Sequence, residues 1–394
     1  MVKKKICIFI TRMISGGAQK VVLQLLRSLP KESYELSLLT SQPDKGEPDL
    51  LGELPDGIKL HLLPELTREL HAVQDANAFF HLKKFLQRER FDLLHLHTSK
   101  AGVLGAFAGR AARVPRIIYT PHGHIFDRRA GIPGVQELPG WKRHLLYRIR
   151  QAAYSCCDTL VALSDADKAE QVALRLARPE KFHVIMNGIE VEHFSLRNAE
   201  SAKNFRREQN IPEDAPLLGS LGRLSFEKGH DILLRAFAKL CKTAGNAKNA
   251  MLVIGGSGAE MNILQSLARE LGIAGHVRFA GNLTDVRPCL WALDVFVLPS
   301  RYESQGLAAM EAMASALPVI ASKTGGVPGI IESGKDGLLV PPENPDALAS
   351  AIGDLLGDTR KRSQLASAAL SRAMRDFTLS RMLSSYQELY EVDT

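Results

Sequence analysis

The sequence has 394 residues, of which 45% are hydrophobic and 24% are charged, and its formal net charge is +7. These fractions are typical of a globular protein and exclude a disordered chain, while the length favours two domains over one core. No apolar run approaches the ~18 residues of a membrane-spanning helix, and five cysteines without C-x-x-C spacing argue against a disulfide framework or a zinc ribbon.

The first apolar run lies close to the N-terminus, at residues 6–10, after the basic stretch 3–5. This pattern resembles the start of a signal peptide. The run is too short for a signal peptide core, however, and it is closed by Thr11 and Arg12. We therefore interpret it as a first strand and expect a cytoplasmic protein.

Strand and helix patterns alternate along the whole chain, which predicts an α/β protein with parallel sheets. In the first half the strands are expected at 5–11, 34–40, 59–63, 92–97, 116–120, 159–163 and 183–186, and the helices at 18–29, 76–90, 100–113, 141–156 and from 164 on. In the second half the strands are expected at 217–221, 251–254, 277–279, 294–298, 319–321 and 337–340, and the helices at 231–243, 261–271, 288–291, 307–314, 347–357, 360–375 and 380–390.

The stretch 188–215 is polar and lacks strand signals, so we place a domain linker there. It separates an N-terminal domain at 1–187 from a C-terminal domain at 216–378, and a final helix occupies 379–394. Ligands of open α/β sheets bind beyond the carboxyl ends of the strands. Glycines, histidines and charged residues gather after the predicted strands, which is the first indication of a binding site.

The most informative stretch follows the predicted strand at 294–298. It is a loop that carries Glu303, followed by a helix that starts near Leu307 and carries Glu311. The free N–H groups and the partial positive charge at a helix N-terminus favour an anion. Taken alone, this stretch is better explained as a helix start with one acid near its first turn and one solvated acid within it.

A second loop, from Gly222 to Gly229, follows the first strand of the C-terminal domain and presents Arg223 and Lys228. A diphosphate needs such partners, because Arg binds oxygens in pairs and Lys acts as a point charge. Together with the helix start near Leu307, the loop predicts a diphosphate site. No G-x-G-x-x-G or Walker A pattern is present, so we do not expect an NAD enzyme or a P-loop ATPase.

Two H-x-H pairs, His95/His97 and His122/His124, could bind zinc. No H-E-x-x-H or cysteine partner accompanies them. We favour the interpretation that they are strand-end histidines that bond hydroxyls or a developing charge.

The D-x-D at Asp165 and Asp167 resembles the metal-binding motif of other sugar-nucleotide enzymes. Ser164, three residues before Asp167, favours a helix cap instead. We expect neither a metal nor a cofactor.

The basic charge is concentrated between Arg110 and Arg150. This segment holds nine Lys and Arg against two acids, an excess equal to that of the whole chain. It could face nucleic acid, an anionic membrane or a phosphorylated acceptor, or it could be the solvated face of a basic helix.

In this order, the motifs resemble those of the retaining glycosyltransferases of family 4, and the resemblance spans nearly the whole chain. It rests on Gly16-Gly-Ala-Gln19, Thr120-Pro-His-Gly123, Asn187-Gly-Ile189, Gly222-Arg-Leu, Glu227-Lys-Gly229, the E-x7-E of Glu303 and Glu311, and Pro318-Val-Ile-Ala-Ser322 with Gly325-Gly326. The stretches 94–102 and 121–124 are similar to the subgroup that builds bacterial capsule, O-antigen and exopolysaccharide. The resemblance implies the GT-B fold, in which two Rossmann-like α/β/α domains face each other across a cleft. It also implies that the last helix returns to the first domain.

The resemblance implies a role for each matching residue at the phosphates of the donor. Arg223 and Lys228 would hold the diphosphate of a UDP- or GDP-linked sugar and stabilise the departing nucleoside diphosphate. Backbone N–H groups at Gln305, Gly306 and Leu307 would add hydrogen bonds from the helix start.

It likewise implies contacts with the rest of the donor. Glu311 would bind the ribose, and Asn282 would border the base. Glu303 would contact the donor sugar, and His122 would lie at the reacting centre on the acceptor side. The Gly16-Gly17 loop would close over the phosphates and the sugar.

The implied activity is that of a metal-independent hexosyltransferase that uses a nucleotide-diphosphate sugar and a glycan or lipid-linked acceptor in bacterial surface polysaccharide synthesis. The basic segment adds the expectation of a peripheral enzyme on the anionic cytoplasmic face of the inner membrane, and nucleic acid is not an expected partner. The alternative is a catalytically idle nucleotide-sugar-binding protein of the same fold, with a zinc hydrolase as a more distant one. Three positions depart from the family pattern, namely Gln19, Gln305 and Ala316.

Overall fold

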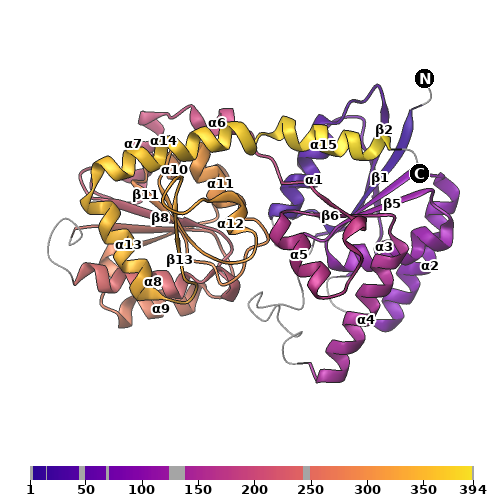
Figure 1. Ribbon diagram of the computed structural model, residues 1–394, viewed down its shortest axis with the longest axis horizontal. Helices are drawn as coiled ribbons and strands as arrows, with labels where there is room; N and C mark the ends of the chain where they lie inside the picture. The colour runs from indigo at the N-terminus through magenta and orange to yellow at the C-terminus, as the bar shows by residue number, and fades with distance from the viewer. Residues whose placement is uncertain are drawn as a thin grey trace. The chain divides into compact units, whose positions relative to one another are not determined.

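A computed structural model of the chain describes residues 3–14, 16–43, 49–67, 71–123, 138–242 and 249–392. They divide into two compact units (Figure 1). Unit 1 holds the described residues up to Gly188 together with those from Ser380 on, and unit 2 holds Ile189–Leu379.

Unit 1 is built on a seven-stranded parallel sheet with the order β3-β2-β1-β4-β5-β6-β7. Its strands are β1 (Lys4–Arg12), β2 (Tyr34–Ser41), β3 (Lys59–Leu62), β4 (Leu93–His97), β5 (Arg116–Thr120), β6 (Thr159–Ala162) and β7 (Phe182–Val184). Its helices are α1 (Gly17–Ser28), η1 (Leu51–Glu53), α2 (Ala72–Glu89), α3 (Ser99–Ala112), α4 (Gly140–Cys156), α5 (Asp165–Ala173), η3 (Pro179–Lys181) and α15 (Leu379–Glu391).

The central strands of unit 1 are buried on both faces, as parallel strands require. The side chains from Ile6 to Ile10 of β1 are fully buried. Helix α3 packs closely on the sheet because glycines replace side chains at the contact. A Cβ atom on Gly102 would lie 2.1 Å from the Tyr119 ring, so any side chain there would displace the tyrosine.

Helix α15 ends the chain and packs on unit 1 beside the N-terminal strands (Figure 1). The Lys4 ammonium donates to the Tyr390 carbonyl at 2.7 Å, and the rings of Tyr34 and Tyr390 meet edge to face at 6.2 Å. Arg116 of β5 donates to the Val392 carbonyl. The last helix therefore forms part of unit 1.

Unit 2 repeats this architecture with a six-stranded parallel sheet of order β10-β9-β8-β11-β12-β13. Its strands are β8 (Leu217–Leu221), β9 (Met251–Gly255), β10 (Val277–Gly281), β11 (Val295–Leu298), β12 (Val319–Ser322) and β13 (Leu338–Val340). Its helices are α6 (Val191–Ser195), α7 (Ala199–Glu208), η4 (Phe226–Lys228), α8 (His230–Cys241), α9 (Met261–Glu270), η5 (Ala274–His276), α10 (Arg287–Ala292), α11 (Leu307–Ala314), α12 (Val327–Ile330), α13 (Pro345–Gly357) and α14 (Thr359–Asp376).

The expected linker at 188–215 differs from the structure, in which α6 and α7 occupy most of this stretch and belong to unit 2. Phe205 on α7 is buried, and Arg206 donates to the carbonyls of Ala215 and Ala292. The polar residues that suggested a linker are the solvent-facing side of an amphipathic helix.

Each sheet has a point where the strand order reverses. In unit 1 it lies between β1 and β4, and in unit 2 between β8 and β11. The loops that leave the two central strands diverge at such a point and leave room for a ligand. In unit 2 these are the loops from 222 to 229 and from 299 to 306, the two stretches that carry most of the predicted donor residues.

Among the described helices, none combines the length and the hydrophobicity that crossing a bilayer requires.

Candidate active site

The loop after β8 exposes a cation. Arg223 is exposed, and no hydrogen bond or ion pair joins its side chain to another residue in the described part of the chain. The next residue anchors the loop, because Leu224 is fully buried and its N–H donates to the Ser257 carbonyl at 2.9 Å. The guanidinium of Arg223 is thus held at the surface of unit 2 on a fixed backbone.

The second cation of this loop meets a predicted acid. The Lys228 ammonium lies 2.7 Å from Oε1 of Glu303, and the Ser300 hydroxyl donates to the same oxygen at 2.8 Å. Glu303 is only 7% exposed. This pair joins the loop after β8 to the loop after β11, so two residues predicted for the donor site are in direct contact.

Three glycines allow the loops around this pair to touch through their backbones. A Cβ atom on Gly229 would lie 2.3 Å from the Pro299 carbonyl oxygen, and Gly229 has a φ of 64°, which favours glycine. A Cβ atom on Gly325 would lie 1.9 Å from the Glu303 carbonyl oxygen. Gly326 donates its N–H to that same oxygen at 3.0 Å. The position of Glu303 is therefore fixed by backbone contacts on two sides.

Helix α11 begins at Leu307, after Gly306 with a φ of 93°. Its first turn holds no acidic residue, so its positive end is not neutralised by its own side chains. Gln305 and Glu311 are both buried, Gln305 in the loop before the helix and Glu311 within it. The expected helix start is present, with N–H groups available to an anion.

Sequence reasoning missed Arg301, which holds the two loops together. Its guanidinium donates to both carboxylate oxygens of Asp231 at 2.8 and 2.9 Å, to the Phe226 carbonyl at 2.8 Å and to Glu343 at 3.0 Å. It also lies 4.1 Å from the centroid of the Phe226 ring. The backbone N–H of Arg301 donates to the Glu227 carbonyl at 2.8 Å. Arg301 thereby fixes the short helix η4 that carries Lys228.

Asp231 is charged in this arrangement. Burial acts to raise the pKa of Asp231, but the hydrogen bonds and charge of Arg301 outweigh it and lower the pKa below its ordinary value. The signal in the sequence that could have revealed this clamp is an arginine three residues after a buried strand and two residues before a predicted site acid.

The predicted residues of unit 1 form a separate cluster of histidines. His95 and His97 lie on one face of β4, with ring centroids 4.0 Å apart, as alternation along a strand predicts. His122 follows β5 and has a φ of 60°. Its Nε2 lies 2.7 Å from Nδ1 of His97, and the two rings are stacked with centroids 5.0 Å apart. His124 lies outside the described residues.

All three imidazoles are neutral at neutral pH. Burial lowers the pKa of His95 to about 3 and the pKa of His122 to about 4. Burial also lowers the pKa of His97 well below 6.5, and the neighbouring rings add to this effect. For His122 the charge of Asp167 opposes the shift.

The remaining predicted residues occupy less specific positions. Gly16 and Gly17 lie at the start of α1, where the Gln19 amide donates to the Arg12 carbonyl at 3.2 Å. Asn282 is exposed after β10 and accepts from the Ser257 hydroxyl at 3.3 Å.

The expected helix cap at Ser164 is confirmed. Its hydroxyl accepts from the Asp167 N–H at 3.0 Å, and the Asp167 carboxylate accepts from the Leu163 N–H at 2.8 Å. Asp167 is therefore used within the fold. Among the described residues, no group of three or more His, Cys, Asp or Glu side chains is placed to hold a metal ion.

Comparison with known proteins places this geometry in a family. Residues 15–193 match the family described as Glycosyltransferase Family 4, and residues 201–372 match Glycosyl transferases group 1. A D-inositol 3-phosphate glycosyltransferase of Corynebacterium urealyticum is 32% identical to this chain, over 95% of this chain and 91% of that protein. The chain belongs to glycosyltransferase family 4.

This family 4 glycosyltransferase is also similar to a second curated protein in sequence and to a solved structure in fold. The UDP-Gal:alpha-D-GlcNAc-diphosphoundecaprenol alpha-1,3-galactosyltransferase of Escherichia coli is 26% identical over 95% of this chain and 93% of its own. The solved structure of HepE from Anabaena, in complex with UDP and glucose, superposes with a TM-score of 0.80 at 21% identity, over 98% of this chain and 99% of that one. The expected GT-B fold is thus confirmed.

We predict that Arg301→Lys destabilises unit 2 of this glycosyltransferase by about 1–3 kcal/mol and weakens UDP binding. A lysine cannot replace the paired bonds to Asp231 or the contact with the Phe226 ring, and it leaves a half-buried carboxylate poorly compensated. Urea unfolding and calorimetric titration with UDP measure the two effects. Arg375→Lys is the matched control, because Arg375 is exposed and water screens its pair with Asp376. Equal effects of both substitutions would contradict the clamp.

We also predict that unit 1 loses stability as the pH falls from 6.5 towards about 4. The unfolded histidines titrate near 6.5 and the buried ones lower, at about 4 for His122. Within this window the unfolded chain binds more protons, so the stabilisation is complete above pH 6.5 and declines below it. Urea unfolding at several pH values measures the slope. Burial also lowers the pKa of His230 in unit 2 to about 4, so His230 likewise makes the protein less stable as the pH falls. The decisive comparison is therefore with His95→Asn, which should have a shallower slope than the unsubstituted chain.

Proposed function

We propose that this enzyme transfers a sugar from a UDP- or GDP-linked donor to a glycan or lipid-linked acceptor, with retention and without a metal, in bacterial surface polysaccharide synthesis. The observation that carries the proposal is the Lys228–Glu303 pair beside the exposed Arg223, at the strand-order reversal of unit 2. The E. coli relative supports the choice of substrates, since its name specifies a UDP-linked donor and a diphosphoundecaprenol-linked acceptor.

Unit 2 would bind the donor through its diphosphate. Arg223 has no competing acceptor among the described side chains, and Lys228 has three N–H donors of which Glu303 takes one. The N–H groups at Gln305, Gly306 and Leu307 add the positive end of α11. Two cations and a helix end would offset most of the charge of a nucleoside diphosphate.

The other predicted residues would orient the rest of the donor. Glu311, within α11, would accept hydrogen bonds from the ribose hydroxyls, and Asn282 would border the base. Glu303 is held by Lys228 and Ser300 through Oε1, which leaves Oε2 to accept from a hydroxyl of the donor sugar.

The chemistry follows from where charge develops. Breaking the bond between the sugar and the phosphate leaves an oxocarbenium-like sugar and adds negative charge to the diphosphate. Arg223, Lys228 and the N–H groups of α11 are fixed donors that would stabilise this charge as it grows. Retention would follow if the acceptor attacks from the same face, with the leaving phosphate oxygen taking the acceptor proton.

Unit 1 would serve the acceptor. We assign His122 to the reacting centre on that side, and the Gly16-Gly17 loop to the phosphates and sugar of the donor. The neutral state of His122 supports this role, because a neutral imidazole can donate a hydrogen bond to an oxygen that gains charge.

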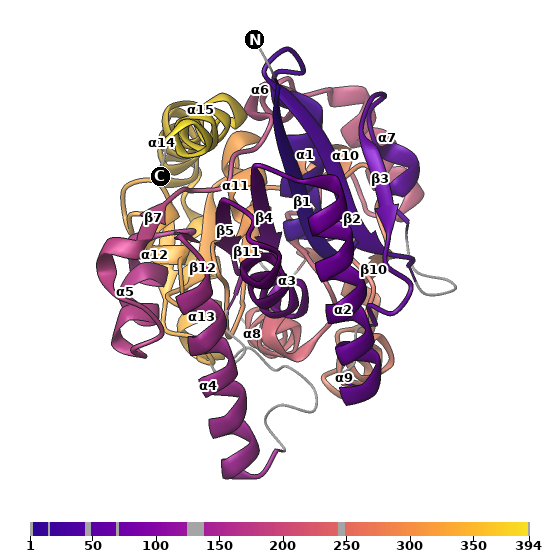
Figure 2. The ribbon, with the colours of Figure 1, turned by 90° about the vertical axis from the view of Figure 1, so that its right-hand side faces the viewer.

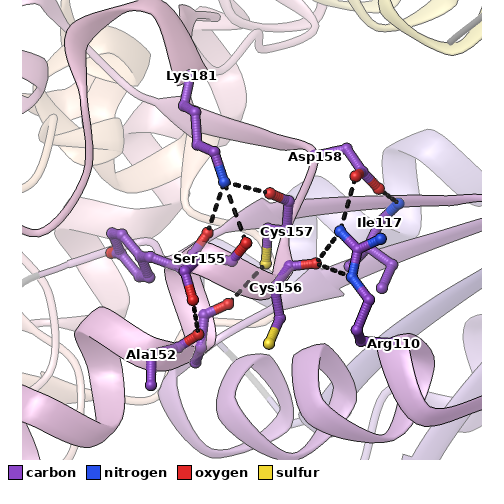
Figure 3. A network of polar contacts seen from close by, with 10 residues as sticks. Arg110, Ile117, Ala152, Ser155, Cys156, Cys157, Asp158 and Lys181 are labelled. Atoms are coloured by element: carbon purple, nitrogen blue, oxygen red, sulfur yellow. Dashed lines mark hydrogen bonds and ion pairs between the residues drawn. The ribbon is translucent and has the colours of Figure 1, made fainter.

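Only some of the cations in the basic segment 110–150 can bind a partner, because others form hydrogen bonds within unit 1. Arg110, Arg116 and Arg150 bond to groups within unit 1. Figure 3 shows how Arg110 and Lys181 hold the carboxyl end of α4, with Lys181 donating to the Cys157 carbonyl at 2.8 Å. The side chains of these cations are therefore engaged in hydrogen bonds within unit 1.

The amino-terminal half of α4 is different, since it extends from the rest of unit 1 (Figure 2). Trp141 and Leu145, one helical turn apart, are 66% and 51% exposed. Lys142 and Arg148 are exposed on the same turns. An exposed aromatic and an aliphatic side chain among cations are typical of a helix that binds an anionic membrane surface. We propose that α4 brings the enzyme to the cytoplasmic face of the inner membrane, where a lipid-linked acceptor resides.

The alternative of an idle nucleotide-sugar-binding protein is less well supported. Arg223, Lys228, Glu303 and Glu311 are all present, and a binding protein would have no need of a leaving-group site.

Arg223→Ala and Lys228→Ala should each weaken UDP binding about 10- to 100-fold, because each removes a charge-assisted bond worth about 1.5–3 kcal/mol. Both should lower donor hydrolysis. Calorimetry with UDP and GDP, followed by an assay of donor hydrolysis, measures these effects. The control is Arg235→Ala, since Arg235 is an exposed cation on α8 of the same unit. Unchanged affinity and hydrolysis in both site variants would disprove the diphosphate assignment.

Co-sedimentation with liposomes should be stronger for anionic than for neutral vesicles, because cations near the surface of α4 each contribute about 1 kcal/mol to binding. Lys142→Glu together with Arg148→Glu should reduce this difference. Lys203→Glu reverses an exposed charge on α7, which is not part of the proposed membrane-binding helix, and should have little effect. Equal sedimentation with both kinds of vesicle would reject the membrane proposal.

A further inference from the structure

We propose that His97 sets the position of the proton on His122, so that Nδ1 of His122 carries the proton and Nε2 does not, and that helix α15 holds His97 in place through His95. His122 is then a hydrogen-bond donor in the reaction and not a general base. The role of His122 as a donor in the reaction rests on the proposed function, whereas the position of its proton does not.

The first step concerns His95 and Tyr390. The Tyr390 hydroxyl lies 2.6 Å from Nδ1 of His95, and both side chains are fully buried. Burial raises the pKa of Tyr390 well above 10, so the hydroxyl keeps its proton. Were Nδ1 of His95 also protonated, two hydrogens would point at each other or the tyrosine proton would lack an acceptor. Tyr390 therefore donates, and His95 carries its proton on Nε2, which donates to the Thr120 hydroxyl at 2.9 Å.

The second step concerns the shared proton between His97 and His122. Nδ1 of His97 and Nε2 of His122 are 2.7 Å apart and both rings are neutral, so one of these two nitrogens carries the hydrogen. The other nitrogen of His97, Nε2, is buried and has no hydrogen-bond partner among the described residues. If His122 donated, this Nε2 would be an N–H group buried without an acceptor.

The opposite arrangement leaves only a lone pair unpaired. An unpaired buried donor is rarer in native proteins than an under-used acceptor. His97 therefore donates from Nδ1 to Nε2 of His122, and neutral His122 must carry its own proton on Nδ1. This assignment uses only the burial and the contacts of His97.

The third step connects the His95–Tyr390 pair with the His97–His122 pair. The rings of His95 and His97 are in contact, with centroids 4.0 Å apart, and Tyr386 of α15 packs against His95 at 5.3 Å. Tyr390 fixes the plane of His95 through its hydroxyl, and His95 in turn limits the rotation of His97. Tyr390, His95 and His97 are thus positioning residues that act through His122.

The direct test is 15N NMR of the full-length chain with 15N-labelled histidine, because the ring nitrogen shifts report which nitrogen carries hydrogen. The His122→Asn variant identifies the His122 signals. We expect Nδ1 of His122 to be protonated and Nε2 to be unprotonated. His97→Asn should keep this pattern, since its amide N–H replaces the Nδ1–H donor, whereas His97→Leu should give a mixture of tautomers. A proton on Nε2 of His122, or an unchanged pattern in His97→Leu, would overturn the proposal.

The activity assay gives a second readout. We expect His97→Leu to lower kcat on the order of 10²-fold and His97→Asn to restore most of the loss. UDP affinity should be unchanged, because the cations assigned to the diphosphate, Arg223 and Lys228, lie in unit 2. Tyr390→Phe should lower kcat about tenfold. Tyr34→Phe, which removes a hydroxyl bonded to Glu391 of α15 at 3.4 Å, should not lower it. Equal losses in His97→Leu and His97→Asn would show that His97 only fills space and would refute the positioning role.

The two readouts separate the proposals. If the chain transferred no sugar but the NMR pattern were as expected, the proposed function would fail and the proton assignment would stand.

Discussion

The close backbone contact between the loops after β8 and β11 is the constraint on which the donor side depends. Gly229 allows its loop to meet the Pro299 carbonyl, and Arg301 then bonds across to Asp231 and to the Phe226 carbonyl. These contacts determine where Lys228 and Glu303 lie, because they fix the backbones of the two loops that carry these side chains. The charged pair is a result of the packing and does not hold the loops together on its own. The helix start at Leu307 adds to a geometry that is already fixed.

The two units differ in where they place charge: the candidate site residues of unit 2 include an exposed cation, whereas those of unit 1 include buried neutral imidazoles. Unit 2 collects cations at the surface, where water and a bound diphosphate can both compensate them. Unit 1 buries three imidazoles and keeps them neutral, because the cost of burial outweighs every opposing charge, including that of Asp167 at His122. A substrate that approached Arg223 would meet a charge, whereas one that approached His122 would meet a fixed dipole. This difference suits a reaction in which the leaving group gains charge and the acceptor begins neutral.

Much of the fold could be predicted from sequence, because local patterns determine it. The strand and helix order, the cap at Ser164 and the helix start at Leu307 depend on neighbours within a few residues. The stretch around α7 was misread, since its burial depends on Arg206 reaching Ala292 far along the chain. Contacts of this kind leave no periodic signal. The same reason hid the partners of Arg301 and the bond between His95 and Tyr390, which are 295 residues apart.

Helix α15 has a consequence for how the protein is made. The strands of unit 1 precede unit 2 in the sequence, yet their sheet is covered in part by side chains of α15, which follow unit 2. Until residues 380–392 are synthesised, the buried face that holds His95 has no Tyr386 or Tyr390 against it. Unit 2 is complete before that point and can fold first, contrary to the usual N-terminal-first order. Folding of unit 1 thus finishes only after unit 2 has been synthesised, which makes the packing around His95 depend on residues that follow unit 2 in the sequence.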